Sequence, residues 1–590
     1  MLVKLFQIHL ISKLFSNLAQ TIGMKTPVLS VLFVLTITCF WTLPACKNNV
    51  DAEDQTGELE NIPALKPVFQ PFTVDSQVIN AFLAQFPDFS FHKAEIHQFY
   101  KNRQYQSAWF NEFGLIEQGG FFINQLEHFE DEGLNDSVLY HAQLKSLHSL
   151  IADPNFIYNS TDTIPKQFEL MLTAEFFVYA QKVWFGVNEK TTQELDWYVT
   201  RKTVPSVAIL DSILSGGANA FTAYEPLYPQ YALLKSVLKK YRQISYTNWD
   251  TLKLPADIKS LKPGDNYPVV ADIKSRLMLF GDAGILDSTT IIDSATVVAI
   301  KQFQTRHGLT GDGVAGEKFF SQINVSPASR IRQLEINMER MRWLPDAPTG
   351  NYIMVNIPEY TMHIFENDTL AWDMKVVVGK SSSSTTIFND ELEYIVFSPY
   401  WVPPPSILNN EILPALKKDA NYLKKENMEA VDLSTKKVVD VSGVEWSKYS
   451  KIPYIIRQKP GNSNSLGWVK FIFPNQHNIY FHDTPSRNLF DKDARSFSHG
   501  CIRVAEPKRF ATYLLRNDTT YTATKIDSLY YLGRETYVKL EEKIPVYLVY
   551  FTAWVDTKGL IHFSRDIYNH DKKLEHTLFG DAKKEEEPQL

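Results

Sequence analysis

Hydrophobic and polar positions divide the chain into a helical part followed by a strand-rich part. Between about 75 and 255, apolar residues recur every three or four positions, the period of an amphipathic helix. One predicted helix face comprises Phe168, Leu172, Phe176, Tyr179 and Val183. A shorter unit over 266–324 keeps this period, whereas the chain beyond 351 contains runs of β-branched and aromatic residues that predict strands. This order predicts a multidomain α+β protein with a helical N-terminal scaffold domain over 75–255.

A polar segment interrupts the strand-rich part. Strands are predicted at 352–357, 360–365, 374–378 and 394–397, and again at 469–473 and 479–482. Residues 404–450 between them are polar, with helical character around 407–416. We expect this insertion to be functional, for example as a lid, because long irregular segments inside compact domains are otherwise uncommon. The mainly-β domain is accordingly placed at 350–535, followed by C-terminal strands and a charged tail over 536–590.

The N-terminus has the pattern of a secretion signal. Lys25 precedes a mostly apolar stretch over 27–41, which is too short to span a membrane comfortably and is followed by a small residue and Cys46. Residues 1–46 resemble a bacterial lipoprotein signal, in which Cys46 receives lipid, although Pro44 departs from that motif. An ordinary cleaved signal or a single membrane anchor is the alternative.

The start of the signal is Met1 or Met24, and a signal that begins at Met24 has the more usual proportions. Residues 47–74 are polar, acidic and proline-containing, which is typical of a linker. All these interpretations place the body of the protein outside the cytoplasm. We expect a periplasmic protein of the cell envelope, anchored to a membrane through lipid on Cys46.

The composition narrows the class of protein. The chain has 590 residues, too many for a single hydrophobic core, so roughly two to four domains are expected. Hydrophobic residues make up 44% and charged residues 22%, which is ordinary for a soluble globular protein. The formal charge is -7 and no basic stripe is present, so we expect no nucleic-acid partner.

The candidate chemistry lies at Cys501. The chain has three cysteines, and because Cys39 and Cys46 fall in the predicted signal, Cys501 is the one thiol of the folded body. It belongs to the run Ser498-His499-Gly500-Cys501-Ile502-Arg503. Upstream, His482 ends a predicted strand that holds its imidazole in place, and the polar segment after it allows the chain to return. An imidazole beside a thiol can take its proton, so the two residues are a candidate nucleophile and base.

The pattern resembles the signature of the L,D-transpeptidase catalytic domain: a histidine, about fifteen residues, Ser-His-Gly-Cys, a hydrophobic residue and Arg. The resemblance implies that Cys501 is the nucleophile and His482 the base. It also implies that the backbone carbonyl of Asp483 orients the imidazole and that His499 lines the site and helps to place the donor. Gly500 lets the backbone approach closely, and the amides around Gly500 and Cys501 are expected to stabilise an oxyanion.

Four further residues are substrate-binding candidates. Arg503 is expected either to hold a carboxylate in bidentate fashion or to brace the loop through a salt bridge. Ser498 has more the character of a turn residue than of a second nucleophile. For Tyr400 and Trp401, which precede the insertion, core packing is the simpler interpretation. Cys501 alone would suggest a buried structural cysteine, and the joint pattern of thiol, base and glycine favours catalysis instead.

Residues 266–324 resemble the small three-helix peptidoglycan-binding module found beside bacterial wall enzymes. His307 in this module is expected to cap or pack and not to bind a metal, because no second ligand lies at a suitable spacing. The tryptophans of the helical part, Trp109, Trp184 and Trp197, are expected to fill helix cores and not to serve as sugar platforms.

The resemblance implies two-step acyl transfer between peptidoglycan peptide stems that act as donor and acceptor. The thiolate attacks the carbonyl of the third residue of a tetrapeptide stem, terminal D-Ala leaves, and the side-chain amine of a neighbouring stem resolves the thioester into a 3→3 cross-link. The resemblance implies no metal or organic cofactor, and it implies sensitivity to carbapenems, which acylate the same thiol. Two alternatives remain: an L,D-carboxypeptidase or hydrolase acting on stems, and a non-enzymatic wall-binding lipoprotein.

Overall fold

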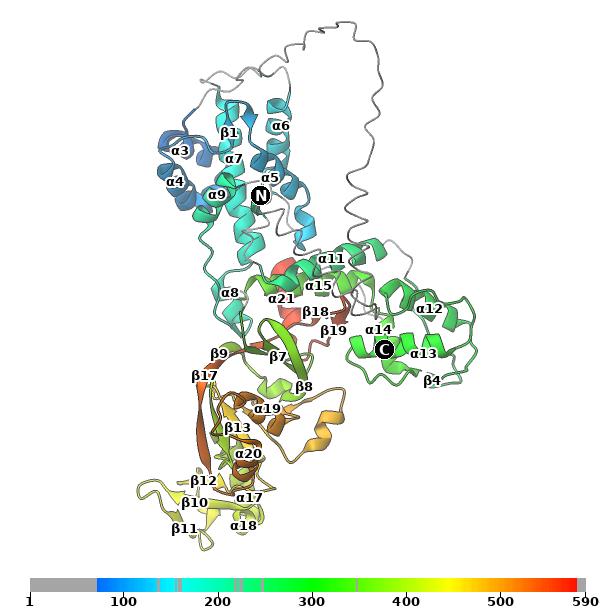
Figure 1. Cartoon of the computed structure of the whole chain (residues 1–590), viewed down its shortest axis with the longest axis vertical. Helices are drawn as coiled ribbons and strands as arrows, with labels where there is room; N and C mark the ends of the chain where they lie inside the picture. The colour runs from blue at the N-terminus through cyan, green and yellow to red at the C-terminus, as the bar shows by residue number, and fades with distance from the viewer. Residues whose placement is uncertain are drawn as a thin grey trace, which may run out of the picture. The chain divides into compact units, whose positions relative to one another are not determined.

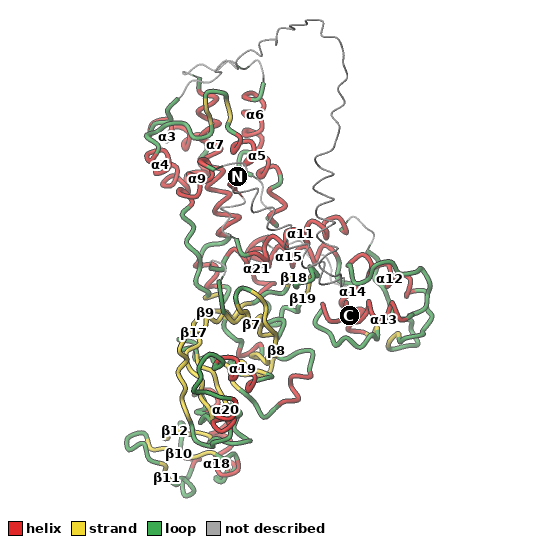
Figure 2. The backbone as a smooth tube through the Cα atoms, viewed as in Figure 1, coloured by secondary structure: helices red, strands yellow, loops and turns green. Residues whose placement is uncertain are grey.

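The computed structural model describes residues 72–580 except 135–137, 154–155, 157–161, 217–219, 222–226, 246–248 and 346–347. Figure 1 follows the elements along the chain, and Figure 2 distinguishes the helices from the strands. The predicted signal over 1–46, including Cys46, lies outside the described residues, and so does most of the predicted linker. Within the described ranges, no helix is both long and apolar enough to span a bilayer.

The first helices pack around α7, which is the longest of them. They are α3 (Ser76–Gln85), α4 (Lys93–Asn102), α5 (Glu117–Glu127), α6 (His141–Ile151), α7 (Thr163–Tyr179) and α9 (Ser206–Ser215), with a hairpin of β1 (Phe110–Asn111) and β2 (Gly114–Leu115). Helix α7 contacts α3, α4, α5 and α6 and is buried along most of its length, as expected of a helix surrounded by others. Trp109, Trp184 and Trp197 are all buried, so the prediction that they fill cores is confirmed.

A second group of helices forms the small module and the segments that flank it. It comprises α8 (Glu189–Glu194), α11 (Pro229–Ile244), α12 (Val269–Phe280), α13 (Ser294–Arg306), α14 (Glu317–Ile323) and α15 (Pro327–Arg342). Helix α11 packs against α15. Helices α12 to α14 form the module with a two-stranded antiparallel sheet of β4 (Ser260–Leu261) and β5 (Ala315–Gly316). His307 stacks on Phe303 with ring centroids 3.8 Å apart, and its Nδ1 lies 2.7 Å from the Phe303 carbonyl oxygen. The packing role predicted for His307 is confirmed.

The strand-rich part folds into a ten-stranded sheet that closes on itself. Its main strands are β6 (Tyr352–Asn356), β7 (Thr361–Glu366), β8 (Thr369–Gly379), β9 (Ile387–Phe397), β13 (Val469–Ile472), β14 (Phe481–His482), β16 (Ile502–Val504) and β17 (Thr536–Val549). Their order is β13-β14-β16-β8-β7-β6-β17-β9, and antiparallel pairing of β13 with β9 closes the ring. β3 (Trp197–Tyr198) adds to β9, and β15 (Ser496–Ser498) adds to β8. The predicted multidomain α+β class, with a mainly-β domain after the helical part and the module, is confirmed.

Two helices and a C-terminal hairpin cover parts of this sheet. Helix α19 (Pro507–Leu514) is amphipathic, and Phe510 on its buried face packs on Phe471 of β13 at a ring distance of 4.6 Å. Helix α20 (Ala523–Tyr530) packs against α19. Further along the chain, β18 (Ala553–Val555) and β19 (Ile561–Phe563) form the hairpin, and α21 (His570–Phe579) packs on α15.

The insertion has its own core and its own small sheet. Its elements are α16 (Pro405–Ile407), the π-helical turn η5 (Leu408–Ile412), α17 (Leu413–Lys418), α18 (Tyr422–Lys425), β10 (Met428–Asp432), β11 (Val438–Val439) and β12 (Tyr454–Gln458). The strands β11, β10 and β12 pair in that order, and Trp446 is buried among the apolar residues of the segment. These strands were not predicted, because a segment this polar overall does not show a period of two.

His363 of β7 carries a buried charge that makes stability depend on pH. Its Nδ1 lies 2.7 Å from the carboxylate of Asp373, its partner on β8, and its Nε2 lies 3.1 Å from that of Glu359. Burial opposes protonation of the imidazole, but Glu359 and Asp373 outweigh it and raise the pKa of His363 to about 10.

The folded pKa exceeds the ordinary value of 6.5, so this stabilisation is complete below about pH 6.5 and is lost as the pH rises through about 10. We expect the free energy of unfolding to fall by on the order of 3 kcal/mol between pH 6.5 and 10. In His363→Gln this part of the pH dependence is expected to disappear. Urea denaturation of both proteins across this range checks it, and identical pH profiles would contradict it.

Candidate active site

Two short strands bring the candidate base and the candidate nucleophile onto one face of the sheet. β14 and β16 pair in parallel, with Phe481 opposite Ile502 and His482 opposite Arg503. Phe481 and Ile502 are fully buried in the core. Since side chains alternate along a strand, His482, Arg503 and Cys501 lie on the other face.

The backbone fixes the tautomer of His482. Its Nδ1 lies 2.5 Å from the backbone carbonyl oxygen of Asp483, which can only accept a hydrogen bond. The proton of the neutral imidazole therefore sits on Nδ1, and Nε2 keeps a lone pair for a proton. This is the contact between His482 and Asp483 that the resemblance led us to expect.

His482 is held in its neutral form. Burial lowers the pKa of its imidazole to about 3, and the cations of Arg503 and Lys470 add to this effect. The sheet register explains the arrangement, because Lys470 of β13 pairs with His482 on one side and Arg503 pairs with it on the other. An imidazole between two cations is uncharged at neutral pH, and the same cations make it a weak base.

Cys501 is half-buried beside the turn that precedes β14. Its Sγ lies 3.6 Å from the carbonyl oxygen of Asn478. Burial raises the pKa of the thiol, while hydrogen bonds from Tyr480 and the charge of Arg503 act in the opposite direction. The ring of Tyr480 also lies 5.8 Å from that of His482, so this tyrosine sits beside both groups. Thiol and imidazole are therefore both neutral at pH 7 in this arrangement.

The loop that carries the thiol is braced from within. Ser498 is buried, and its hydroxyl donates to the Cys501 carbonyl at 2.5 Å and accepts the Gly500 N–H at 3.1 Å. Gly500 has φ +118°, a conformation that favours glycine. In this conformation the Gly500 N–H is engaged by Ser498, and stabilisation of an oxyanion by the amides around Gly500 and Cys501 stays a prediction. Ser498 makes the contacts of a turn residue.

The β8–β9 connection supports the same loop. Thr385 is buried and its hydroxyl donates to the Gly500 carbonyl at 2.7 Å, while it accepts the N–H of Gly379 at 2.9 Å. The backbone N–H of Lys380 donates to the Ser498 carbonyl at 3.0 Å. The backbone on either side of His499 is thereby tied to a second segment of the sheet.

His499 faces the insertion. Its Nε2 lies 3.2 Å from a carboxylate oxygen of Glu411 in η5, and both side chains are partly exposed. The insertion therefore reaches the loop that carries Cys501. This contact agrees with the position expected of a lid.

Tyr400 and Trp401 lie at the base of the insertion. The backbone N–H of Tyr400 donates to Glu535, and the guanidinium of Arg457 lies 4.1 Å from its ring centroid. Trp401 pairs through its backbone with Gln458 at the end of β12 and packs against the core of the insertion. These contacts join the insertion to the sheet, and none of them is with His482 or Cys501.

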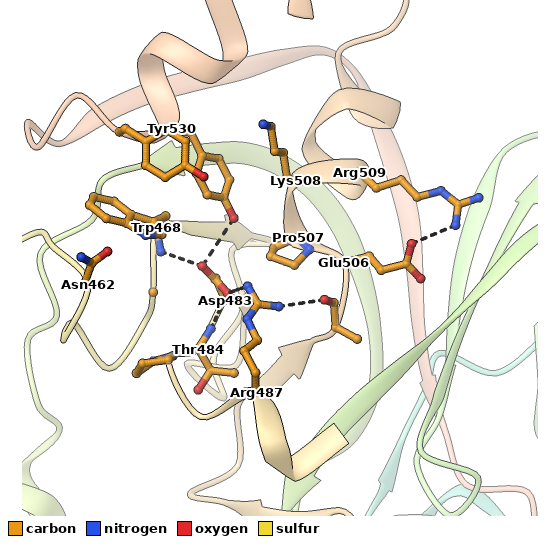
Figure 3. A pocket seen from close by; sticks show the side chains of 14 residues that line it. Asn462, Trp468, Asp483, Thr484, Arg487, Glu506, Pro507, Lys508, Arg509 and Tyr530 are labelled. Carbon is orange, nitrogen blue, oxygen red and sulfur yellow. Dashed lines mark hydrogen bonds and ion pairs between the residues drawn. The ribbon is translucent and has the colours of Figure 1, made fainter. Parts of the chain in front are cut away.

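The side chain of Asp483 lines a pocket that neither Cys501 nor His482 lines. Figure 3 shows it at the centre of a cluster in which it accepts the N–H groups of Trp468 at 2.9 Å and Thr484 at 2.6 Å and pairs with Arg487. A Cβ at Gly467 would overlap the Asp483 carboxyl group, so glycine is required there. The cluster anchors the start of the segment that connects His482 to Cys501.

Sequence reasoning missed Tyr480, Thr385 and Glu411. Tyr480 was detectable, because it stands two residues before His482 in a predicted strand and so shares its face. Thr385 and Glu411 come from segments more than 80 residues before the Ser-His-Gly-Cys run, and nothing in their local pattern indicates a contact with it. In the described ranges, no group of three or more His, Cys, Asp or Glu residues is arranged to hold a metal ion.

Three family models match the chain. The model described as "L,D-transpeptidase catalytic domain" matches residues 350–527. We call residues 350–527 the transpeptidase domain after this match. The model described as "Scaffold domain" matches 94–238, and the one described as "Putative peptidoglycan binding domain" matches 266–323. The transpeptidase domain contains Cys501, His482 and the insertion.

A curated relative from Haemophilus influenzae, "Putative L,D-transpeptidase", is 34% identical over 254 residues. The match covers 43% of this chain and 51% of that protein, so it spans about half the length of the relative. Two solved structures also share similarity with the chain. An L,D-transpeptidase from Xylanimonas cellulosilytica has 14% identity and a TM-score of 0.17, over 50% of this chain and 100% of that one. An L,D-transpeptidase in complex with imipenem has 13% identity and a TM-score of 0.17, over 35% and 61%. TM-scores this low do not establish that either structure shares the fold of residues 350–527.

The neutral thiol of the transpeptidase domain leads to a test by alkylation. Iodoacetamide reacts with thiolate, so the alkylation rate of Cys501 should rise continuously from pH 6 to 9 without a plateau, because burial raises the pKa of this thiol. Peptide mass spectrometry at Cys501 measures the rate, and His482→Gln serves as the comparison. A plateau between pH 6 and 8 that disappears in His482→Gln would show a thiolate–imidazolium pair and contradict the account.

Proposed function

We propose that the protein is an L,D-transpeptidase that forms 3→3 cross-links between peptidoglycan stems through an acyl-enzyme on Cys501. The observation that supports this most directly is the placement of Cys501, Tyr480, His482 and Arg503 on one face of two paired strands. The match of this segment to the transpeptidase model supports the reaction class.

In the first step, Sγ of Cys501 attacks the carbonyl carbon of the third residue of a tetrapeptide stem. Nε2 of His482 takes the thiol proton as the C–S bond forms, since Nδ1 is occupied by the Asp483 carbonyl. The proton then passes to the nitrogen of terminal D-Ala, the peptide bond breaks, and a thioester remains. His482 is neutral at pH 7, so the lone pair of its Nε2 is available for this proton.

In the second step, the side-chain amine of an acceptor stem attacks the thioester carbonyl. His482 takes a proton from this amine and returns it to the departing Cys501 sulfur, which restores the neutral pair. A new amide bond joins the two stems and frees them from Cys501, and the D-Ala released in the first step is the leaving group of the overall reaction. If water attacks instead, the same thioester yields a tripeptide, so access of water decides between cross-linking and carboxypeptidase activity.

Arg503 is suited to bind a carboxylate of the donor stem. Among the described residues it has no carboxylate partner, and its buried Nε–H has no acceptor. A guanidinium left unpaired beside the thiol attracts an anionic group, and a planar carboxylate is the group it fits in bidentate fashion. The loop-bracing alternative for Arg503 lacks a partner in this structure.

We further propose that the protein acts in the cell envelope, in the periplasm, anchored through lipid on Cys46. The matches to the transpeptidase and peptidoglycan-binding models support the compartment, because peptidoglycan lies outside the cytoplasm. The proposed partners are donor and acceptor stems and, as inhibitors, carbapenems. No organic cofactor enters the two steps.

Substitution of the nucleophile provides the main test. Purified protein mixed with imipenem should gain the mass of one inhibitor on Cys501, and with tetrapeptide-bearing muropeptides it should release D-Ala and form 3→3 dimers. Cys501→Ala should lose both activities entirely, whereas Ser486→Ala, a substitution at an exposed residue of the connecting segment, should retain them. Dimers formed by Cys501→Ala would contradict the mechanism, and tripeptide without dimers from the unaltered protein would favour the carboxypeptidase.

The contact between His499 and Glu411 leads to a second test. Glu411→Gln removes one charge from the contact that joins the insertion to the thiol loop, so water should reach the thioester more often. An exposed ion pair contributes up to about 1 kcal/mol, so we expect the ratio of hydrolysed to cross-linked product to rise about twofold to fivefold. Glu426→Gln, on the same insertion but without a contact to the loop, is the matched control. Equal product ratios for both variants and the unaltered protein would contradict a lid function for this contact.

A further inference from the structure

A pocket lies beside Asp483, the residue that follows His482 in the chain. It has a volume of about 580 Å³ and is formed by the turn after β14, the start of α19, the end of α20 and the segment before β13 (Figure 3). Asp483 lines it, whereas Cys501, His482 and Arg503 do not. Its volume is in the range of pockets that hold small ligands.

The ionised groups that line this pocket are already neutralised within the protein. Arg487 pairs with Asp483, Arg509 lies 2.9 Å from Glu506, and Lys508 lies 2.5 Å from Asp527 of α20. A charged ligand would have to displace one of these partners. A neutral ligand rich in hydroxyl and amide groups can instead add hydrogen bonds to the pairs as they stand.

One wall of the pocket is aromatic. Trp468 and Tyr531 meet edge to face with ring centroids 5.3 Å apart, and Tyr530 lies 5.3 Å from Tyr531. Tyr531 is 59% exposed, which is a large exposed fraction for a tyrosine in contact with two other rings. Exposed aromatic faces with polar groups nearby suit ligands that have one apolar and one polar surface. A pyranose ring has such surfaces, with C–H groups on its faces and hydroxyl groups around its edge.

We propose that this pocket binds N-acetylamino-sugar units of the glycan strand. Asn462 at its edge offers an amide donor and acceptor for the hydroxyl and acetamido groups. The inference rests on the proposed function, because only a peptidoglycan substrate brings a sugar next to its stem. A glycan held here lies against Asp483, the residue after His482, so the pocket positions the strand whose stem reaches Cys501. The peptide stem itself is the competing occupant.

Binding of a β-1,4-linked N-acetylglucosamine tetramer to the full chain tests this proposal. Tyr531→Ala should weaken binding about tenfold, which corresponds to the loss of about 1.4 kcal/mol from one stacking contact. Tyr537→Ala is the matched control, because Tyr537 is also 59% exposed but does not line the pocket. The module over 266–323 is unchanged in the unaltered protein and in both variants, so its own sugar binding is the same in all three. A difference in tetramer affinity between these proteins therefore reports on the pocket.

Three outcomes would overturn the proposal. The first is that the unaltered protein does not bind the tetramer, and the second is that all three proteins bind it equally. The third is that Tyr531→Ala weakens binding of a free tetrapeptide stem and not of the tetramer, which would assign the pocket to the peptide. Sugar binding requires no catalysis, whereas the proposed reaction is judged by adduct and dimer formation on Cys501. Failure of one proposal is therefore distinguishable from failure of the other.

Discussion

The parallel pairing of β14 with β16 determines where the candidate catalytic residues lie. It sets Tyr480 and His482 beside Cys501 and Arg503 on one face, and it places His482 between the cations of Lys470 and Arg503. Parallel neighbours need a connection of about a dozen residues or more, because the chain must return to the same end of the sheet. The spacing between His482 and the Ser-His-Gly-Cys run therefore follows from the sheet, and the connection is where supporting contacts collect. Asp483 anchors its start, and Ser498 braces its end.

The site is assembled from segments far apart in the sequence, each with a different physical role. The β8–β9 connection supplies Thr385, which holds the backbone of the thiol loop from the buried side. The insertion supplies Glu411, which meets the same loop from the exposed side. The insertion can present Glu411 because it has its own core and sheet. Rigid support on one side and a weak, exposed contact on the other suit the catalytic role proposed for Cys501.

The sequence predicted the local features of the site better than its long-range contacts. Cys501, His482 and the carbonyl of Asp483 follow from a motif and a strand end, and Tyr480 follows from the alternation of side chains. The strands of the insertion escaped prediction because their apolar positions are few and are separated by polar turns. Thr385 and Glu411 could not be predicted, because tertiary contacts across more than 80 residues leave no periodic signal in a single sequence. The engagement of the Gly500 amide by Ser498 likewise depends on side-chain geometry, which spacing alone does not determine.

The central claim is that a neutral imidazole with its proton on Nδ1 presents Nε2 to Cys501. The ¹⁵N chemical shifts of selectively labelled histidines, with His482 assigned by comparison with His482→Gln, measure this directly. The account predicts that at pH 7 the His482 Nδ1 is protonated and Nε2 is not, and that the ring does not titrate above about pH 4, because burial and two neighbouring cations lower its pKa to about 3. A proton on Nε2, or an imidazolium at pH 7, would contradict it.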